Sequence, residues 1–420
     1  MSAVLHKIGD GVRVVIDPMP NVRSVSCGVF VLAGARDETE EEHGGAHLVE
    51  HLAFKGAGSR TGFELSRDME TVGGWTNADT SHERTAYYAR ALSDDFTLAM
   101  EIIRDLALFP HADETALEQE KKVILQEIAE AADTPDDVML ELLQQASFGG
   151  HSLGGSILGS AASVESFSLD AVQAFRHETN NPGTVIVSIA GGVSVDRALS
   201  MANELYGAWS RERKPQRRPR FAPRFTSGFE HQRADCDQSH LGIAFPAVPA
   251  GDDAAPAFRV LGEILGGGMS SRLFQDIREK HGLAYTIDAA YEPYSDAGLI
   301  TVTTGTADRY TQKTAGLIVE NLASLATSVT EEELGRAVKT LLAGSIMAME
   351  NPSSRMDQAA GQVITHGAPI PFDLVAEKYN SLTLEDVKKA AQMALSCPPA
   401  AALVGGASPI SVREALCQVS

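Results

Sequence analysis

The chain has 420 residues, 44% of them hydrophobic and 22% charged, which is the balance of a globular protein large enough for two cores. Its 35 basic and 56 acidic residues give a net charge of 35 − 56 = −21, which argues against nucleic acid as a partner, because phosphates are bound by basic surfaces. The simplest reason for the acidity is solubility. With no signal-peptide pattern and no apolar run of about 20 residues, we expect a cytoplasmic, bacterial protein with no membrane partner.

The pattern of apolar residues predicts a similar order of elements twice along the chain. The predicted elements of the first half are a strand within 24–38, a helix over 44–56, a strand over 83–92 and two helical stretches between about 94 and 150. The predicted elements of the second half are a strand within 238–250, a helix over 257–268, strands over 284–293 and 298–306, and two helices between about 308 and 349.

The two halves also share a register, since Leu117 aligns with Leu334 and Pro135 with Pro352, both at an offset of 217. A duplicated domain explains this better than chance. A stretch rich in proline and arginine separates the copies, and an exposed connector is a simpler interpretation of it than a binding patch. We therefore expect an N-terminal domain over 1–211, a linker over 212–230 and a homologous C-terminal domain over 231–420. The expected fold class is α+β, with a mostly antiparallel sheet packed with helices in each domain.

Two other patterns point away from a functional site. The four cysteines show no CxxC spacing and are expected to be buried thiols, without a disulfide framework or a metal cluster. The run Gly266-Gly267-Gly268 has no Lys-Ser/Thr after it, so it does not predict a phosphate loop.

The first chemistry-bearing motif is His47-Leu48-Val49-Glu50-His51, or H-x-x-E-H. Residues four apart lie on one face of a helix, so His47 and His51 can direct ring nitrogens at a single ion. Glu50 lies on nearly the same face and can act as general base for a zinc-bound water. A chance match is the simpler interpretation of five residues alone. The apolar residues around the motif favour a buried helix, in which an unpartnered His-Glu-His cluster would be costly.

A third ligand has to come from another segment, and the helical pattern around 114–133 offers two glutamates. Glu120 and Glu127 are 127 − 120 = 7 residues apart, or two helical turns, so they face the same way. A solvated acidic face is the usual role of such glutamates. The positions that correspond to them in the second half are Ala337 and Gly344, so only the first half is equipped for a metal.

Taken together, these motifs resemble the pitrilysin family of inverted-motif zinc peptidases. The likeness rests on GGAHLVEHLAFKG, a glutamate 127 − 51 = 76 positions after the second histidine, GGWTNADTSHERTAYY, NPGTVIVSIAGG and GGGMSSRLFQDIREKHGLAY. It covers nearly the whole chain and is greatest for the short two-domain branch that contains the processing peptidases of mitochondria. The resemblance implies two homologous domains that face each other as a clamshell around a chamber.

The resemblance also implies roles for individual residues. It implies one Zn²⁺ per chain, with His47, His51 and Glu127 as its ligands, Glu50 as the base, and Glu120 as the accessory glutamate that supports the site.

From the second half, Arg278 and Tyr285 match the pair that reaches the bound substrate and donates hydrogen bonds near the scissile carbonyl. Asn77 and Ala78 match positions on an edge strand to which a peptide adds as a further strand. Without the resemblance, the residue types alone would favour a surface position for Arg278 and a core position for Tyr285.

We therefore expect a zinc metalloendopeptidase that binds extended peptides or unfolded precursor segments. Because the zinc motif and the Arg278–Tyr285 pair lie in one chain, we expect a self-sufficient enzyme that forms a homodimer. The alternative is a non-catalytic structural or peptide-capturing homologue of the processing peptidases, for which the loss of a ligand or of the base would be expected.

Overall fold

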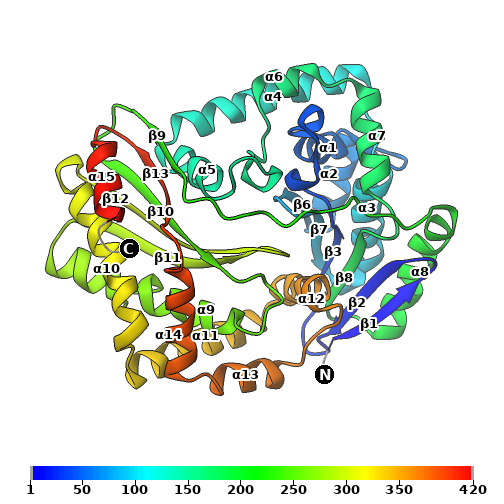
Figure 1. The fold of residues 1–420 in the computed structure, drawn as a ribbon. Helices are drawn as coiled ribbons and strands as arrows, with labels where there is room; N and C mark the ends of the chain where they lie inside the picture. The colour runs from blue at the N-terminus through cyan, green and yellow to red at the C-terminus, as the bar shows by residue number, and fades with distance from the viewer. Residues whose placement is uncertain (1–2, 418–420) are drawn as a thin grey trace. The chain divides into compact units, whose positions relative to one another are not determined.

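A six-stranded sheet forms the frame of the first of two units in the computed structural model, which describes residues 3–417 (Figure 1). In sheet order its strands are β1 (Val4–Ile8), β2 (Val12–Pro18), β8 (Val185–Gly191), β3 (Ser24–Val31), β7 (Thr85–Leu92) and β6 (Trp75–Thr80). The longer helices of this unit are α1 (Gly45–Ala53), α2 (Gly62–Thr71), α3 (Phe96–Leu108), α4 (Glu114–Asp133), α7 (Leu169–Thr179), α8 (Val195–Glu212) and α12 (Pro352–His366), with the shorter α6 (Ala161–Ser166).

A five-stranded sheet forms the frame of the second unit. In sheet order its strands are β11 (Ala284–Pro293), β12 (Gly298–Thr306), β10 (Ser239–Ala247), β13 (Ala400–Val404) and β9 (Phe229–Gln232). Its helices are α5 (Pro135–Phe148), α9 (Ala255–Gly266), α10 (Thr311–Ser328), α11 (Glu331–Ala348), α13 (Phe372–Asn380), α14 (Leu384–Ala394) and α15 (Pro409–Cys417). Both sheets are antiparallel except for one parallel pair each, β2 with β8 and β13 with β9. The α+β class with mostly antiparallel sheets is confirmed.

The two sheets repeat one topology. The order β2-β8-β3-β7-β6 of the first corresponds strand for strand to β9-β13-β10-β12-β11 of the second, and the parallel pair lies at the same end of the order. Helices α4 and α11 begin at Glu114 and Glu331, which are 331 − 114 = 217 residues apart. The structure thus repeats the offset found in the sequence.

Each unit takes one helix from the other half of the sequence. Helix α5 begins at Pro135 and packs on the second sheet, whereas α12 begins at the corresponding Pro352 and lies against β2, β3 and β8 of the first (Figure 1). Met356 and Val363 of α12 are 1% and 0% exposed in that contact. The compact units are therefore built from different segments than the two sequence repeats, and the sequence boundaries of the domains stay a prediction.

The basic connector between α8 and β9 is tied to the first unit by ion pairs. Residues 213–228 form neither helix nor strand. Arg218 pairs with Glu42. Nε and Nη2 of Arg220 each lie 2.7 Å from an oxygen of the Asp37 carboxylate. The side chains of Arg218 and Arg220 are only 16% and 24% exposed, so both are partly covered rather than extended into solvent.

Two predictions about local features are wrong. Between 94 and 150 there are three helices instead of two, because Pro110 and Pro135 each interrupt the helical pattern and Pro135 starts a new helix. Of the four cysteines only Cys27 is buried, whereas Cys236 and Cys397 are partly exposed and Cys417 is exposed. Within residues 3–417, no helix is long and apolar enough to cross a membrane.

The ion pair between Asp17 and Arg355 fastens α12 to β2 and should dominate the stability of that contact. Two guanidinium nitrogens of Arg355 lie 2.6 Å from the two oxygens of Asp17, which is 6% exposed. In Arg355→Ala a nearly buried carboxylate would lose its cation, so we expect a loss of about 3 kcal/mol in the free energy of unfolding, measured by chemical denaturation.

Lys378→Ala serves as the control, because its pair with Asp253 is solvated at 3.4 Å and should contribute almost nothing. Equal denaturation midpoints for Arg355→Ala and Lys378→Ala would contradict the importance of the buried pair.

Candidate metal centre

Helix α1 carries both histidines of the motif, and a buried carboxylate holds its first turn. Gly44 precedes the helix with φ of +89°, a conformation that glycine adopts without strain. The two oxygens of Glu38 accept hydrogen bonds from the amides of Gly44 and Ala46 at 2.8 and 2.7 Å. A carboxylate at a helix N-terminus also interacts favourably with the helix dipole. Burial nevertheless raises the pKa of Glu38 to about 8, with the two amides acting in the opposite direction.

The side chains of His47, His51 and Glu127 converge on one point in the first unit. One ligand atom from each lies within 4.8 Å of the others. Among residues 3–417, no other group of three or more histidine, cysteine or acidic residues is placed to hold a metal ion. Nε2 of His47 lies 3.2 Å from Nε2 of His51, and the Glu127 carboxylate lies 3.8 Å and 3.5 Å from these two nitrogens. Zinc ligands at about 2.1 Å in tetrahedral geometry are separated by about 3.4 Å, so these spacings fit the ion.

The two glutamates of α4 approach opposite nitrogens of the same ring. Glu127 faces Nε2 of His51, whereas Glu120 lies 3.0 Å from Nδ1. A carboxylate at Nδ1 holds the proton there and leaves the Nε2 lone pair for a metal. Glu120 is 4% exposed, and the Lys55 ammonium lies 2.5 Å from its other oxygen, so its buried charge is compensated.

The protonation of His47 also suits a metal ligand. Burial, and then the neighbouring His51, lowers the pKa of His47 to about 4, so the ring is neutral near pH 7. Its Nδ1 is buried without a hydrogen-bond partner among residues 3–417. Two neutral imidazoles and a carboxylate are the donor set of a catalytic zinc site, which keeps a further position for water.

Glu50 lies on the same helix beside this cluster and contacts the neighbouring sheet. The hydroxyl of Thr80 donates a hydrogen bond of 2.5 Å to Oε2 of Glu50. Burial raises the pKa of Glu50, and the Thr80 hydrogen bond and His51 act against that rise. A carboxylate with a raised pKa is a better proton acceptor for general-base chemistry near neutral pH.

The strand that ends at Thr80 is an edge of the first sheet. Strand β6 pairs only with β7, so its outer hydrogen-bonding groups are unpaired by the sheet. Asn77 is exposed on this strand, whereas Ala78 is 8% exposed and faces the core. An open edge of this kind is where an extended peptide adds to a sheet.

In the second unit the structure brings Arg278 and Tyr285 together. The Arg278 guanidinium lies 4.9 Å from the centre of the Tyr285 ring and 4.5 Å from that of Phe274, in cation–π geometry. Arg278 lies on a π-helical turn, Phe274–Lys280, a geometry often found at functional sites, and Tyr285 lies on the edge strand β11 and is 73% exposed.

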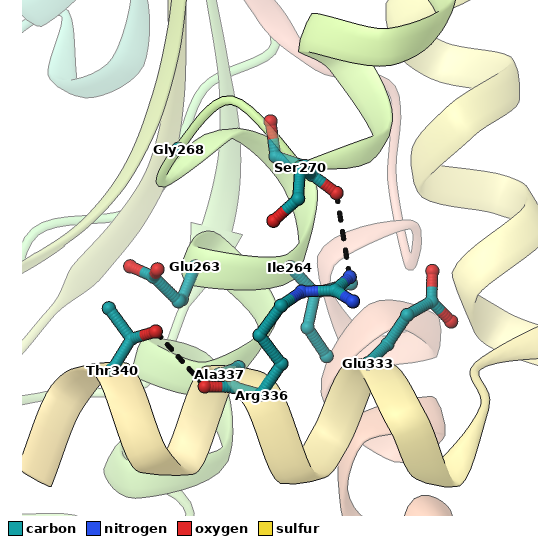
Figure 2. Close-up of a pocket in the computed structure, with 9 residues that line it drawn as sticks. Glu263, Ile264, Gly268, Ser270, Glu333, Arg336, Ala337 and Thr340 are labelled. Carbon is teal, nitrogen blue, oxygen red and sulfur yellow. Dashed lines mark hydrogen bonds between the residues drawn. The ribbon is translucent and has the colours of Figure 1, made fainter.

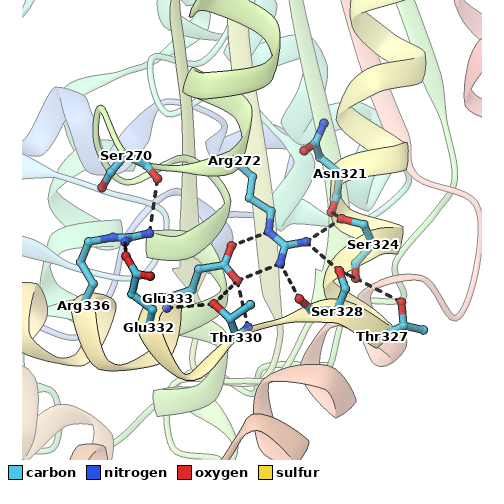
Figure 3. A network of polar contacts seen from close by, with 10 residues as sticks. All are labelled: Ser270, Arg272, Asn321, Ser324, Thr327, Ser328, Thr330, Glu332, Glu333 and Arg336. Carbon is cyan, nitrogen blue, oxygen red and sulfur yellow. Dashed lines mark hydrogen bonds and ion pairs between the residues drawn. The ribbon is translucent and has the colours of Figure 1, made fainter. Parts of the chain in front are cut away.

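A polar network holds the loop that leads into this turn. Figure 3 shows Arg272 between Glu333 at the start of α11 and serines at the end of α10. Its Nε lies 2.7 Å from Glu333 and its Nη1 lies 2.7 Å from the Ser324 hydroxyl. The Arg272 hydrogen bond is the main cause that lowers the pKa of Glu333 to about 2. These contacts fix the segment before Arg278 and leave Arg272 itself with a structural role.

A small pocket adjoins that network, and two of its polar side chains bond to backbone carbonyls. Its volume is about 30 Å³, enough for little more than water. Figure 2 shows Arg336 directed at the carbonyl of Ser270, at 3.4 Å, and Thr340 bonded to the Arg336 carbonyl. The residues that line the pocket are Glu263, Ile264, Gly268, Ser270, Ser271, Glu333, Arg336, Ala337 and Thr340. The pocket therefore does not compete with the histidine cluster as the functional site.

Sequence reasoning missed three residues at the metal centre. Thr80 belongs to the edge-strand motif, and Lys55 follows His51 by one helical turn, so both had a local signal. Glu38 lies six residues before Gly44, beyond the usual capping distance, and had none.

Comparison with known sequences assigns the chain to a family. The family model described as Insulinase (Peptidase family M16) matches residues 13–161, and the model described as Peptidase M16 inactive domain matches residues 166–341. A protein of Bacillus subtilis named uncharacterized zinc protease YmxG is 33% identical over 94% of this chain and 96% of its own length. Proteins of Mycobacterium tuberculosis and Rickettsia felis, also named uncharacterized zinc proteases, are each 32% identical. The first covers 94% of this chain and 91% of its own length, and the second covers 96% and 97%.

Solved structures show the same fold. A protease from Helicobacter pylori superposes with a TM-score of 0.88 at 17% identity and covers 96% of this chain and 99% of its own. A structure from Pseudomonas fluorescens, described as a peptidase M16 inactive domain, superposes with a TM-score of 0.89 at 20% identity. It covers 97% of this chain and 98% of its own. The resemblance inferred from the motifs is confirmed, and this chain belongs to the M16 family of peptidases.

Proposed function

We propose that this protein is a zinc metalloendopeptidase that hydrolyses extended peptides or unfolded precursor segments. The observation that carries the proposal is the convergence of His47, His51 and Glu127 within 4.8 Å, with Glu50 on the same helix. Relatives named zinc proteases support zinc as the metal, and one such cluster among residues 3–417 supports one ion per chain.

In the proposed mechanism zinc, when bound, supplies a Lewis acid that polarises the peptide carbonyl and activates water. Glu50 takes a proton from that water and passes it to the leaving amine. Glu120 keeps the Nδ1 proton of His51 in place, so that Nε2 remains a ligand.

We propose that Tyr285 and Arg278 donate hydrogen bonds to the carbonyl region of the substrate, where negative charge develops. We further propose that the substrate lies along β6 near Asn77 and Ala78. Main-chain hydrogen bonds to an edge strand require an extended peptide, which excludes folded segments as substrates. A second copy of the chain is the proposed partner in a homodimer.

The alternative is a non-catalytic homologue that captures peptides or serves as a structural subunit. The family model for residues 166–341 is described as inactive, and the second half of the sequence has Ala337 and Gly344 where the first half has Glu120 and Glu127. The first half, however, retains three ligands and the base, which favours the enzyme.

Replacement of the base tests the proposal directly. In Glu50→Gln the ligand atoms are unchanged, so we expect one zinc per chain, as in wild type. Cleavage of a quenched-fluorescent peptide library should fall by at least about 100-fold, because an amide does not accept the proton. Zinc is quantified by mass spectrometry, and a chelator should abolish wild-type cleavage. A wild type that binds zinc and cleaves no peptide would favour the non-catalytic alternative.

Zinc affinity should depend on Glu120. In Glu120→Gln the carboxylate that orients His51 becomes neutral, so we expect affinity for zinc to fall by about 10- to 100-fold, measured by competition with a chelator. Glu118→Gln is the control, because Glu118 lies on the same helix with its side chain 59% exposed. Equal affinities for the two variants would show that Glu120 does not support the site.

The hydroxyl of Tyr285 should affect turnover without affecting the metal. Tyr285→Phe removes one donor from an exposed ring, so we expect kcat to fall by about 100-fold with zinc content unchanged. Tyr310→Phe is the matched control, because Tyr310 also lies beneath an arginine, Arg309, at 4.6 Å. Unchanged kcat in Tyr285→Phe would exclude the tyrosine from catalysis.

A further inference from the structure

We propose that Thr80 is the positioning residue of Glu50, so that the edge strand offered to the peptide also orients the base. The inference rests on the proposed function, because it gives Glu50 the role of general base.

The contact itself joins two different elements of the first unit. Thr80 is the last residue of β6, and its Oγ1 donates to Oε2 of Glu50, on α1, at 2.5 Å. A hydroxyl donor to a carboxylate forms a short, charge-assisted hydrogen bond of high directionality. Among residues 3–417, Thr80 alone donates a hydrogen bond to the Glu50 carboxylate, and it does so at Oε2. The other oxygen, Oε1, therefore remains available to take a proton.

The position of Thr80 is fixed by the turn that follows it. The carbonyl of Ser81 accepts a hydrogen bond from the amide of Ala35 at 3.1 Å, and that of His82 accepts one from Arg36 at 2.8 Å. The Arg36 side chain is 1% exposed, so this anchor is buried. Strand β6 therefore ends against the segment 35–36 and has little freedom to withdraw its hydroxyl.

The position of Glu50 is fixed by the same segment of chain. Glu38, two residues after Arg36, binds the first turn of α1 through Gly44 and Ala46. The helix that carries Glu50 and the strand that carries Thr80 are thus both bonded to residues 35–38. Pre-organisation of this kind is what a catalytic side chain needs, because a base that is misplaced by about 1 Å loses much of its effect.

Other hydroxyls nearby do not share this role. Thr85 lies opposite Thr80 in the β6–β7 register, but its hydroxyl donates to the carbonyl of Ala33 at 3.1 Å. Thr76 lies on the same face of β6 as Thr80, four residues earlier and opposite Ala89, and contributes no side-chain hydrogen bond to Glu50. Thr85 is therefore the matched control, because it lies on β7, outside the strand proposed to receive the peptide, and its hydroxyl bonds Ala33.

The test compares three variants of the full chain with wild type on a quenched-fluorescent peptide. Thr80→Val keeps the shape and removes the hydroxyl, Thr80→Ser keeps the hydroxyl, and Thr85→Val removes a neighbouring hydroxyl that bonds Ala33. We expect kcat to fall by about 10- to 100-fold in Thr80→Val, with KM within about twofold and one zinc per chain. Thr80→Ser and Thr85→Val should keep kcat within about threefold.

Each other outcome rejects a stated claim. A Thr80→Val variant as fast as Thr85→Val, or one with raised KM and unchanged kcat, overturns the inference while the proposed function stands. A serine variant as slow as the valine variant overturns it as well, because the loss would then be steric. If Thr80→Val loses zinc, Thr80→Ala replaces it in the same comparison. A wild type that cleaves nothing overturns the proposed function and the inference with it.

Discussion

The arrangement of the first unit depends on one constraint, which is that two imidazoles and a carboxylate from different helices must face one point. His47 and His51 meet this requirement through the helical repeat alone, but Glu127 has to arrive from α4. Once Glu127 has arrived, the two ring nitrogens, 3.2 Å apart, and its carboxylate are close enough to bind one ion together. The surrounding contacts are therefore those that hold α1 and α4 in place.

Those contacts use buried carboxyl groups whose oxygens each have polar partners. Glu120 lies between His51 and Lys55, and Glu38 lies against two amides at the start of α1. A buried carboxylate contributes to specificity only when all its partners are present, because an unpaired one costs several kcal/mol. The candidate metal centre is thus surrounded by groups whose partners are all satisfied in one geometry, as the proposed positioned base would require.

The second unit shows what the duplication retained and what it changed. The sheet order repeats that of the first unit, and α11 begins 331 − 114 = 217 residues after α4, so the two units share one backbone arrangement. The side chains at the metal positions did not follow, since Ala337 is 3% exposed and belongs to the apolar core. The second unit instead has Arg278 stacked on Tyr285 at its own sheet edge. A common frame therefore carries two different sets of polar groups.

Much of this protein was determined by local sequence. The spacing of His47, Glu50 and His51 places them on one face of any helix that forms there, and the repeat at 217 residues predicted matching helices that the structure contains. These are properties of single elements, which follow from the helical period and from proline at a helix start.

Tertiary structure alone decided which elements meet. Local sequence places Thr80 in the edge-strand motif and Lys55 one helical turn after His51, but it does not indicate their partners, Glu50 and Glu120. Nor does it indicate that α5 and α12 pack on the sheets of the opposite halves. Such contacts depend on the order of strands in the sheet and on the path of the connections between elements. A periodic pattern in the sequence shows which face of an element is apolar, but it does not show which surface will cover that face.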